Sequence, residues 1–272
     1  MKESGNGISA PWQPRIIFFD IDGTLLPFGE DRIRPAVAEA LTIAHGRGIR
    51  LFIATGRAPF ALPDLGEIPF DGVMCFNGSY SFDQDGPIYS EPMDPLDVKT
   101  VIRNAEEMGF PVTIATATRF ANNFYQEDLA RYLALSHQEY IIPPDYVRMQ
   151  DEPVYQLMAG TPAEYDELLL RGAPHSTTAR WWDRAVDIIP RHCGKGKGID
   201  MILRHYDIPR ADSMAFGDGG NDADMLSFAG VGVAMGNAAP ETKAIADHVT
   251  DSCDRDGVLT AFRHFGLIPP SL

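Results

Sequence analysis

The chain is poor in cysteine and in positive charge. Its 272 residues include three cysteines, which are far apart and form no Cys-x-x-Cys pair, so neither a disulfide framework nor a thiolate zinc site is expected. With 23 Lys+Arg against 38 Asp+Glu, the formal net charge is -15. This balance argues against nucleic acid or an anionic membrane as a partner. Any anionic small molecule would need a local cationic site.

Long apolar runs are missing as well. No stretch reaches the length of a transmembrane helix, and the polar segment from Met1 to Gln13 has no apolar signal-peptide core. We therefore expect a cytoplasmic protein. The seven histidines show no paired metal-ligand spacing, and no internal repeat is present. The length suits one large or two moderate domains.

The most informative stretch is an apolar run that ends in two carboxylates. Ile16 to Phe19 lead directly into Asp20 and Asp22, and Gly23 follows. A short branched and aromatic run predicts a strand that is buried on both faces. Residues two apart on a strand point the same way, so both aspartates can face one ligand. The carboxyl ends of strands are where parallel α/β sheets bind ligands.

Two alternatives exist for this Asp-x-Asp-Gly segment. A calcium loop requires an oxygen ligand at its fifth position and a bidentate Glu at its twelfth. Here these positions hold Thr24 and Asp31, and a strand precedes the segment. An ordinary turn is the other alternative. Because two unpaired carboxylates at one point are costly without a compensating cation or proton, we favour a functional site.

Strands and helices alternate at both ends of the chain. A second strand from Ile49 to Ala54 and a third from Phe70 to Phe76 follow the first, with helical segments between them. This order is typical of a doubly wound parallel α/β sheet. The stretch 82–187 is far longer than one crossover requires and reads as an inserted α+β domain. We therefore predict a core of residues 1–81 and 188–272 and an inserted domain of residues 82–187.

Polar groups follow several of the predicted core strands. Thr55, Gly56 and Arg57 end the second strand, Lys195 precedes a predicted helix, and the glycine-rich run 217–222 follows a strand and opens another helix. Carboxylate oxygens suit Mg2+, and loop amides at a helix start suit a phosphate.

These segments resemble the haloacid dehalogenase superfamily, in particular its Cof-type phosphatases, which carry a large cap after the third core strand. Four motifs occur in the family's order, and the resemblance covers nearly the whole chain. The motifs are Asp20-Ile21-Asp22-Gly23-Thr24, Thr55-Gly56-Arg57, Lys195-Gly196 and Gly217-Asp218-Gly219-Gly220-Asn221-Asp222. The resemblance implies a Mg2+-dependent hydrolase of small phosphorylated metabolites, such as sugar phosphates.

The resemblance also implies roles for individual residues. Asp20 would be the nucleophile that forms an aspartyl-phosphate, and Asp22 would act as general acid and then as general base. The other implied roles are phosphate binding by Thr55, Gly56, Lys195 and Asn221, and Mg2+ binding by Asp20, the backbone carbonyl of Asp22, and Asp218, with Asp222 contacting a metal water or orienting Lys195.

Several alternatives stay open at this point. A phosphotransferase or phosphomutase could use the same aspartate, and a non-catalytic phospho-ligand sensor needs no nucleophile. Thr55 and Asp222 could simply cap helices, and Arg57 is interpreted as a structural surface partner. Lys195 is preferred to Lys197 as the motif lysine, because Lys197 is expected to face solvent. The sequence gives no signal for the oligomeric state.

The residues that select the substrate leave only weak signals. The loops 119–123 and 180–182 of the inserted domain are candidates, and Asn77, at the tip of the third strand, is a candidate for contact with the leaving group.

Overall fold

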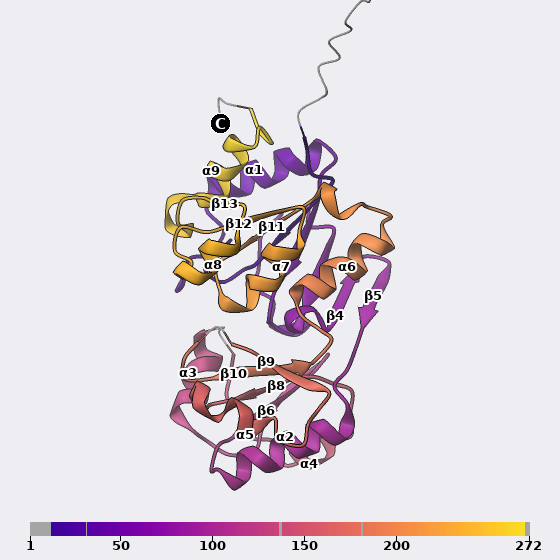
Figure 1. The fold of residues 1–272 in the computed structure, drawn as a ribbon, viewed down its shortest axis with the longest axis vertical. Coiled ribbons are helices and arrows are strands. Elements are labelled where there is room, and N and C mark those ends of the chain that lie inside the picture. Colours follow the sequence, from indigo (N-terminus) through magenta and orange to yellow (C-terminus); the bar gives the residue numbers. More distant parts are fainter. Residues whose placement is uncertain (1–11, 31, 136–137, 181, 270–272) are drawn as a thin grey trace, which may run out of the picture.

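The computed structural model describes residues 12–30, 32–135, 138–180 and 182–269. It contains two β-sheets, one above the other along the long axis of the molecule (Figure 1). The first sheet has eight strands in the order β13-β12-β11-β1-β2-β3-β4-β5. Their bounds are β1 (Ile16–Phe19), β2 (Arg50–Ala54), β3 (Gly72–Cys75), β4 (Tyr80–Asp83), β5 (Gly86–Ser90), β11 (Ser213–Gly217), β12 (Val231–Ala234) and β13 (His248–Val249).

Strand β1 lies in the middle of the first sheet and pairs in parallel with β2 and β11. Its four residues are fully buried, as the apolar run predicts. Ile17 and Phe19 pack against α1 (Pro35–Gly46) and α9 (Gly257–His264), which cover one face. Ile16 and Phe18 pack on the other face against α6 (Lys195–His205) and α7 (Ala223–Phe228). The alternation of the strand thus supplies both layers of the core, and the predicted α/β class is confirmed.

The second sheet is antiparallel, with five strands in the order β7-β6-β8-β10-β9. Three helices cover the face that lies away from the first sheet, and α3 lies on the opposite side, where Tyr132 and Leu133 pack with residues of the core such as Ala61 and Phe76. The bounds are β6 (Val112–Thr116), β7 (Phe120–Asn122), β8 (Val154–Ala159), β9 (Ser176–Ala179), β10 (Val186–Pro190), and for the covering helices α2 (Pro95–Glu107), α4 (Tyr146–Met149), α5 (Asp166–Leu169), with α3 (Glu127–Leu135) opposite.

The remaining helices are short. They are α8 (Pro240–Ile245) and the 3-10 turns η1 (Pro59–Ala61), η2 (Phe76–Gly78), η3 (Ala163–Tyr165), η4 (Arg210–Asp212), η5 (Gly220–Asp222) and η6 (Cys253–Arg255). Within the described ranges, no helix is both long and apolar enough to span a membrane.

The strands β4 and β5 bear on the domain boundaries. They form an antiparallel hairpin that continues the first sheet beyond β3. The predicted boundary at residue 82 therefore falls inside β4, and the one between residues 187 and 188 falls inside β10 of the second sheet. Because a hairpin has the same alternating pattern whichever sheet it joins, the sequence could not assign it. We propose that the cap begins after Ser90 and ends at Pro190.

A β-bulge in β8 decides which of its side chains face the core. The register with β6 shifts so that Ala115 is opposite Gln156 and Thr116 is opposite Val154. Val154 and Leu157 pack under α2, whereas Tyr155 stacks on Phe76 of the core, with ring centroids 5.4 Å apart. The bulge thus turns both Tyr155 and Gln156 toward the first sheet, as bulges near functional sites commonly re-aim side chains.

Two helix starts differ in their capping. The carboxylate of Asp94 caps α2, since it accepts the backbone N–H groups of Leu96 and Asp97. The segment Thr161-Pro162-Ala163-Glu164 has the residue pattern of a capping box, but Pro162 stands at the N-cap of the 3-10 turn η3, and the buried Thr161 hydroxyl has no hydrogen-bond partner.

Candidate active site

Three carboxylates meet at the carboxyl ends of β1 and β11. One oxygen each of Asp20, Asp218 and Asp222 can be chosen so that all three lie within 4.8 Å of one another. Gly23 allows this approach, because it has a φ of +85° and a Cβ at this position would lie 2.3 Å from Oδ2 of Asp218. Any side chain there would displace the carboxylate, so the glycine of the first motif fixes the spacing of the cluster.

Lys195 neutralises part of this cluster. Its side chain is fully buried, and Nζ lies 2.6 Å from Oδ1 of Asp20 and 2.5 Å from Oδ1 of Asp222. The other oxygen of Asp222 accepts the backbone N–H groups of Asp218 (2.9 Å) and Gly219 (2.8 Å). Both oxygens of Asp222 are therefore engaged, which suits a residue that orients the lysine and the glycine-rich loop.

The neighbouring Lys197 differs from Lys195 in its exposure and in its ion-pair partner. Its side chain is 39% exposed and pairs with Asp200 at 3.1 Å on the outer face of α6. Nothing in the described structure joins it to the carboxylate cluster, in agreement with the expectation that Lys197 faces solvent.

The charges of the cluster favour a bound cation or proton. Burial raises the pKa of Asp20 well above its usual value; Lys195 opposes this shift, and the carboxylates of Asp222, Asp218 and Asp22 add to it. Burial and Asp222 raise the pKa of Asp218 to about 7. Burial alone would lower the pKa of Lys195, but Asp20 and Asp222 outweigh it and raise that pKa above its ordinary value. One lysine thus leaves the cluster short of positive charge.

The predicted phosphate-binding groups lie at the same edge of the sheet. Thr55, Gly56 and Asn221 line one cavity together with Asp20 and Asp22. The hydroxyl of the buried Thr55 accepts the backbone N–H of Arg57 at 3.1 Å, which leaves its own proton available for another acceptor. The geometry therefore brings all the sequence-predicted polar groups of the core together.

Arg57 has a different place from the one predicted. It is buried, and its guanidinium donates to both oxygens of Asp22, at 2.9 Å and 2.6 Å, and to the carbonyl of Ala61 at 3.2 Å. Its interpretation as a surface partner is therefore wrong. A bidentate pair fixes the plane of a carboxylate, so Arg57 sets the orientation of Asp22. The sequence signal for this role was the position of Arg57 shortly after β2, the strand next to β1.

Asn237 is a site residue that the sequence did not reveal. Its Nδ2 donates to Oδ2 of Asp218 at 3.1 Å and to the carbonyl of Gly23 at 2.9 Å. The Thr24 hydroxyl donates to the other oxygen of Asp218 at 3.0 Å. Asn237 thus links the first motif to the fourth. Asn237 and Gly23 are more than 200 positions apart in the sequence, so no local sequence pattern predicts this contact.

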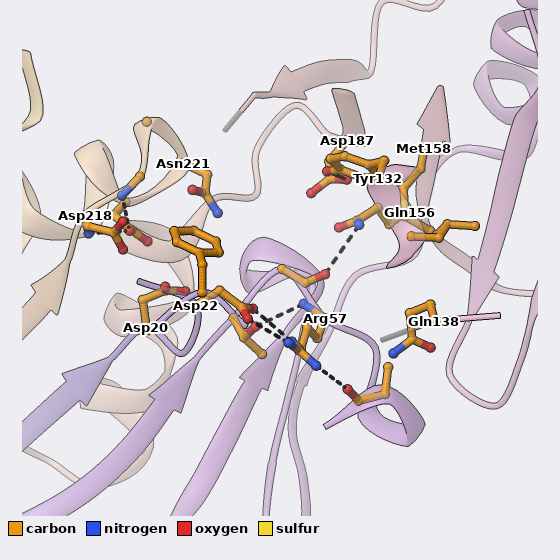
Figure 2. Close-up of a pocket in the computed structure, with 18 of the residues that line it drawn as sticks. Asp20, Asp22, Arg57, Tyr132, Gln138, Gln156, Met158, Asp187, Asp218 and Asn221 are labelled. Atoms are coloured by element: carbon orange, nitrogen blue, oxygen red, sulfur yellow. Dashed lines mark hydrogen bonds and ion pairs between the residues drawn. The ribbon is translucent and has the colours of Figure 1, made fainter. Parts of the chain in front are cut away.

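The cavity lies between the two sheets and has a volume of about 240 Å³. Figure 2 shows Asp20 and Asp218 on the core side, across from Asp187, Tyr132 and Gln156 of the inserted segment. Of the residues in the loops 119–123 and 180–182, Phe120 lines the cavity, and Trp181 lies outside the described residues.

Asn77 connects the two sides of the cavity. Its Oδ1 accepts Nδ2 of Asn221 at 2.9 Å, and its Nδ2 donates to Oε1 of Gln156 at 3.1 Å and to Oδ2 of Asp187 at 2.9 Å. These bonds occupy both amide protons, and Asn77 is 1% exposed. Its assignment as a contact of the leaving group is therefore not supported by its position; it links Asn221 to the inserted segment.

This fold and this set of side chains define a family. The family model for haloacid dehalogenase-like hydrolases matches residues 17–262, and the chain belongs to that family. The resemblance of the four motifs is thereby confirmed.

Individual relatives agree with the family. The chain is 30% identical to YkrA of Bacillus subtilis, whose name assigns it provisionally to the phosphatases, over 93% of this chain and 98% of the relative. It is 30% identical to the HMP-PP phosphatase of Yersinia enterocolitica over 92% of this chain and 95% of the relative. Among solved structures, the subclass IIB sugar phosphatase BT4131 is 34% identical, with a TM-score of 0.85 over 93% of this chain and 99% of that one. The chain is thus a phosphatase of the haloacid dehalogenase type.

Proposed function

We propose that this protein is a Mg2+-dependent phosphatase of small phosphorylated metabolites, sugar phosphates or similar phosphomonoesters, which acts through an aspartyl-phosphate in the cytoplasm. The observation that carries the proposal is Lys195, buried between Asp20 and Asp222, two carboxylates that line the cavity. A nucleophilic carboxylate beside a fixed cation is what transfer of a phosphoryl group to an aspartate requires.

The donor set fits a hard divalent cation. Carboxylates of Asp20 and Asp218 lie within the cluster, and the backbone carbonyl of Asp22 follows Asp20 at the end of β1. Oxygen-only ligands of this kind suit Mg2+, which when bound would screen the negative charges of the phosphate and the nucleophile. We assign Asp222 to orienting Lys195 and not to direct metal contact, since both of its oxygens are already hydrogen-bonded.

The proposed chemistry has two steps. An oxygen of Asp20 attacks phosphorus, the bond to the leaving oxygen breaks, and Asp22 gives that oxygen a proton. A water molecule then attacks the aspartyl-phosphate and gives a proton to Asp22, which releases inorganic phosphate and restores Asp20. The phosphate would be held by Lys195, Thr55, the Gly56 backbone and Asn221.

Phosphoenzyme trapping tests this assignment. Acid quenching of the wild-type protein with Mg2+ and 32P-labelled 4-nitrophenyl phosphate, whose leaving group departs without a general acid, should leave label on the chain. Asp20→Asn should show none, because an amide is a poor nucleophile, whereas Asp22→Ala should retain label because hydrolysis loses its general base. Asp183→Asn, at an exposed position of the inserted segment, is the matched control. Equal labelling of wild type and Asp20→Asn would contradict the assignment.

Two alternatives predict different products. A phosphotransferase or mutase would pass the label to an added alcohol or sugar and not to water. A sensor would bind a phosphate ester without turning it over. A panel of phosphorylated metabolites, with HMP-PP included because of the relatives named for it, should release inorganic phosphate if the protein is a hydrolase.

A further inference from the structure

Asp187 is a buried carboxylate at the cap side of the cavity, and it forms no direct ion pair with any described residue. It lies on β10, where Val186 and Ile188 face the α2 layer, and it is 1% exposed while lining the cavity. Tyr132 donates to its Oδ1 at 2.6 Å, and Asn77 donates to its Oδ2 at 2.9 Å. Within the described part of the chain, no lysine or arginine forms an ion pair with it.

The hydrogen-bonding capacity of Asp187 is only half used. A carboxylate accepts about four hydrogen bonds, and Tyr132 and Asn77 supply two. Burial of a charge is costly unless donors complete its shell. The amide of Gln156 stands beside it on the same wall, where Asn77 donates to its Oε1 at 3.1 Å and its Nε2 donates to the carbonyl of Gly56 at 3.3 Å. A ligand that donates hydrogen bonds would complete this wall.

The charge of the cavity further restricts the kind of ligand that it can accept. Its lining residues include five aspartates, listed here: Asp20, Asp22, Asp187, Asp218 and Asp222. Arg57, the cationic residue among them, is paired with Asp22, and Lys195 is paired with Asp20 and Asp222. The core can receive one phosphate with its metal. Lys195 and Arg180 are close enough to act on Asp187 electrostatically, but both are engaged by other carboxylates, so among the described residues no cation is placed to pair with a second anion on this wall. Met158, Leu133 and Phe120 add apolar surface.

From this arrangement we propose that Asp187 is a specificity-determining residue: it accepts a hydrogen bond from a hydroxyl of a neutral leaving group and rejects leaving groups that carry a carboxylate or a second phosphate. This inference rests on the proposed phosphatase function. Tyr132 and Asn77 are positioning residues that hold the carboxylate toward the cavity.

Matched pairs of phosphate esters test the proposal. Glycerol 3-phosphate and 3-phosphoglycerate share a skeleton and differ by a hydroxymethyl group in place of a carboxylate. At about pH 8, where Asp187 is ionised because its pKa is raised only to about 7, the wild-type protein with Mg2+ should favour glycerol 3-phosphate in kcat/KM by at least about tenfold, the scale of one unfavourable buried charge contact. Asp187→Asn, which keeps the volume, should reduce that preference to less than about threefold.

A second comparison separates recognition from structure. Asp187→Ala should lower kcat/KM for glucose 6-phosphate by about ten- to a hundredfold, mainly through KM, because a hydrogen bond to a charged group is lost. With 4-nitrophenyl phosphate, whose leaving group has no hydroxyl to donate before cleavage, the change should be less than about threefold. Asp183→Asn, the exposed control, should change neither substrate.

The outcomes separate the two proposals. If the wild-type protein hydrolyses none of these esters, the proposed function fails. If it hydrolyses 4-nitrophenyl phosphate but Asp187→Asn and Asp187→Ala slow all substrates equally, Asp187 is only structural and the specificity role is overturned. A wild-type preference for 3-phosphoglycerate would overturn it as well. Should Asp187→Ala fail to fold, Asp187→Asn and Tyr132→Phe decide the question with the same substrates.

Discussion

Replacement of Lys195 by alanine removes the cation of the carboxylate cluster. In the folded protein, Nζ lies 2.6 Å from Asp20 and 2.5 Å from Asp222, and the side chain is fully shielded from water. Loss of a fixed charge that stabilises a transferring phosphoryl group costs about 3 kcal/mol or more, by analogy with the removal of one oxyanion donor. We therefore expect kcat/KM of Lys195→Ala to fall at least about a hundredfold.

The same substitution should weaken the fold. Removal of one partner from a buried ion pair typically costs about 3–5 kcal/mol, because the remaining charges are left uncompensated. The assay is therefore steady-state release of phosphate from 4-nitrophenyl phosphate at saturating Mg2+, at a temperature where circular dichroism shows the variant folded. Saturation with Mg2+ separates loss of the lysine from loss of metal affinity.

Lys197→Ala is the matched control, two residues further along the same glycine-rich segment. Its pair with Asp200 is partly exposed, and such pairs contribute about 0–1 kcal/mol. Its kcat/KM should change by less than about threefold. A folded Lys195→Ala with wild-type activity, or a larger loss in Lys197→Ala, would refute the assignment of the motif lysine.

Three further predictions follow from the site. Treatment with a chelator should abolish turnover, and added Mg2+ should restore it. Added Mg2+ should also raise the melting temperature, because a cation relieves repulsion in the carboxylate cluster. Full activity of metal-free protein would contradict the metal assignment. Burial raises the pKa of Asp187 to about 7, so the folded chain holds a proton that the unfolded chain has released, and the stability from this proton is lost as the pH rises through about 7. Chemical denaturation between about pH 5 and 8 should show this loss below about pH 7, with a slope of up to about 1.4 kcal/mol per pH unit. Asp187→Asn should make the slope shallower without removing it, because the pKa of Asp218 is also raised to about 7; an unchanged slope would rule out Asp187 as a source. Arg57→Ala should lower kcat by about tenfold or more, because Asp22 loses both donors that orient it, and Arg57→Lys should restore only part of the loss since lysine lacks the planar fork; wild-type kcat in Arg57→Ala would contradict a positioning role.

The core of the site could be predicted because its information is local. Each motif combines a buried strand with the polar residues that end it, and parallel strands bring such ends to one edge. The four buried residues of β1 and the placement of Asp20, Asp218 and Lys195 follow from patterns a few residues long. The sequence shows that a glycine stands at position 23, but only the structure shows its close approach to Asp218.

The cap side could not be predicted because its information is in register and long-range pairing. The bulge that turns Gln156 toward the core is a shift in the register between β6 and β8, and no residue type in β8 predicts it. Asp187 has one local sequence signal, because it is a single carboxylate within an apolar strand. Arg57 was misassigned because its partner, Asp22, is 35 residues away and the pairing depends on the adjacency of β1 and β2.

The short segment between β10 and α6 separates the residue proposed to select the leaving group from the lysine proposed to act on the phosphate. Asp187 precedes Pro190 on a strand of the cap sheet, and Lys195 follows Gly194 at the start of a helix of the core. A chimera joined between these two points, with its other joint after Ser90, would exchange the leaving-group wall while keeping every charge that acts on phosphorus. A family built this way can acquire new substrates by replacement of one segment, without rebuilding its chemistry.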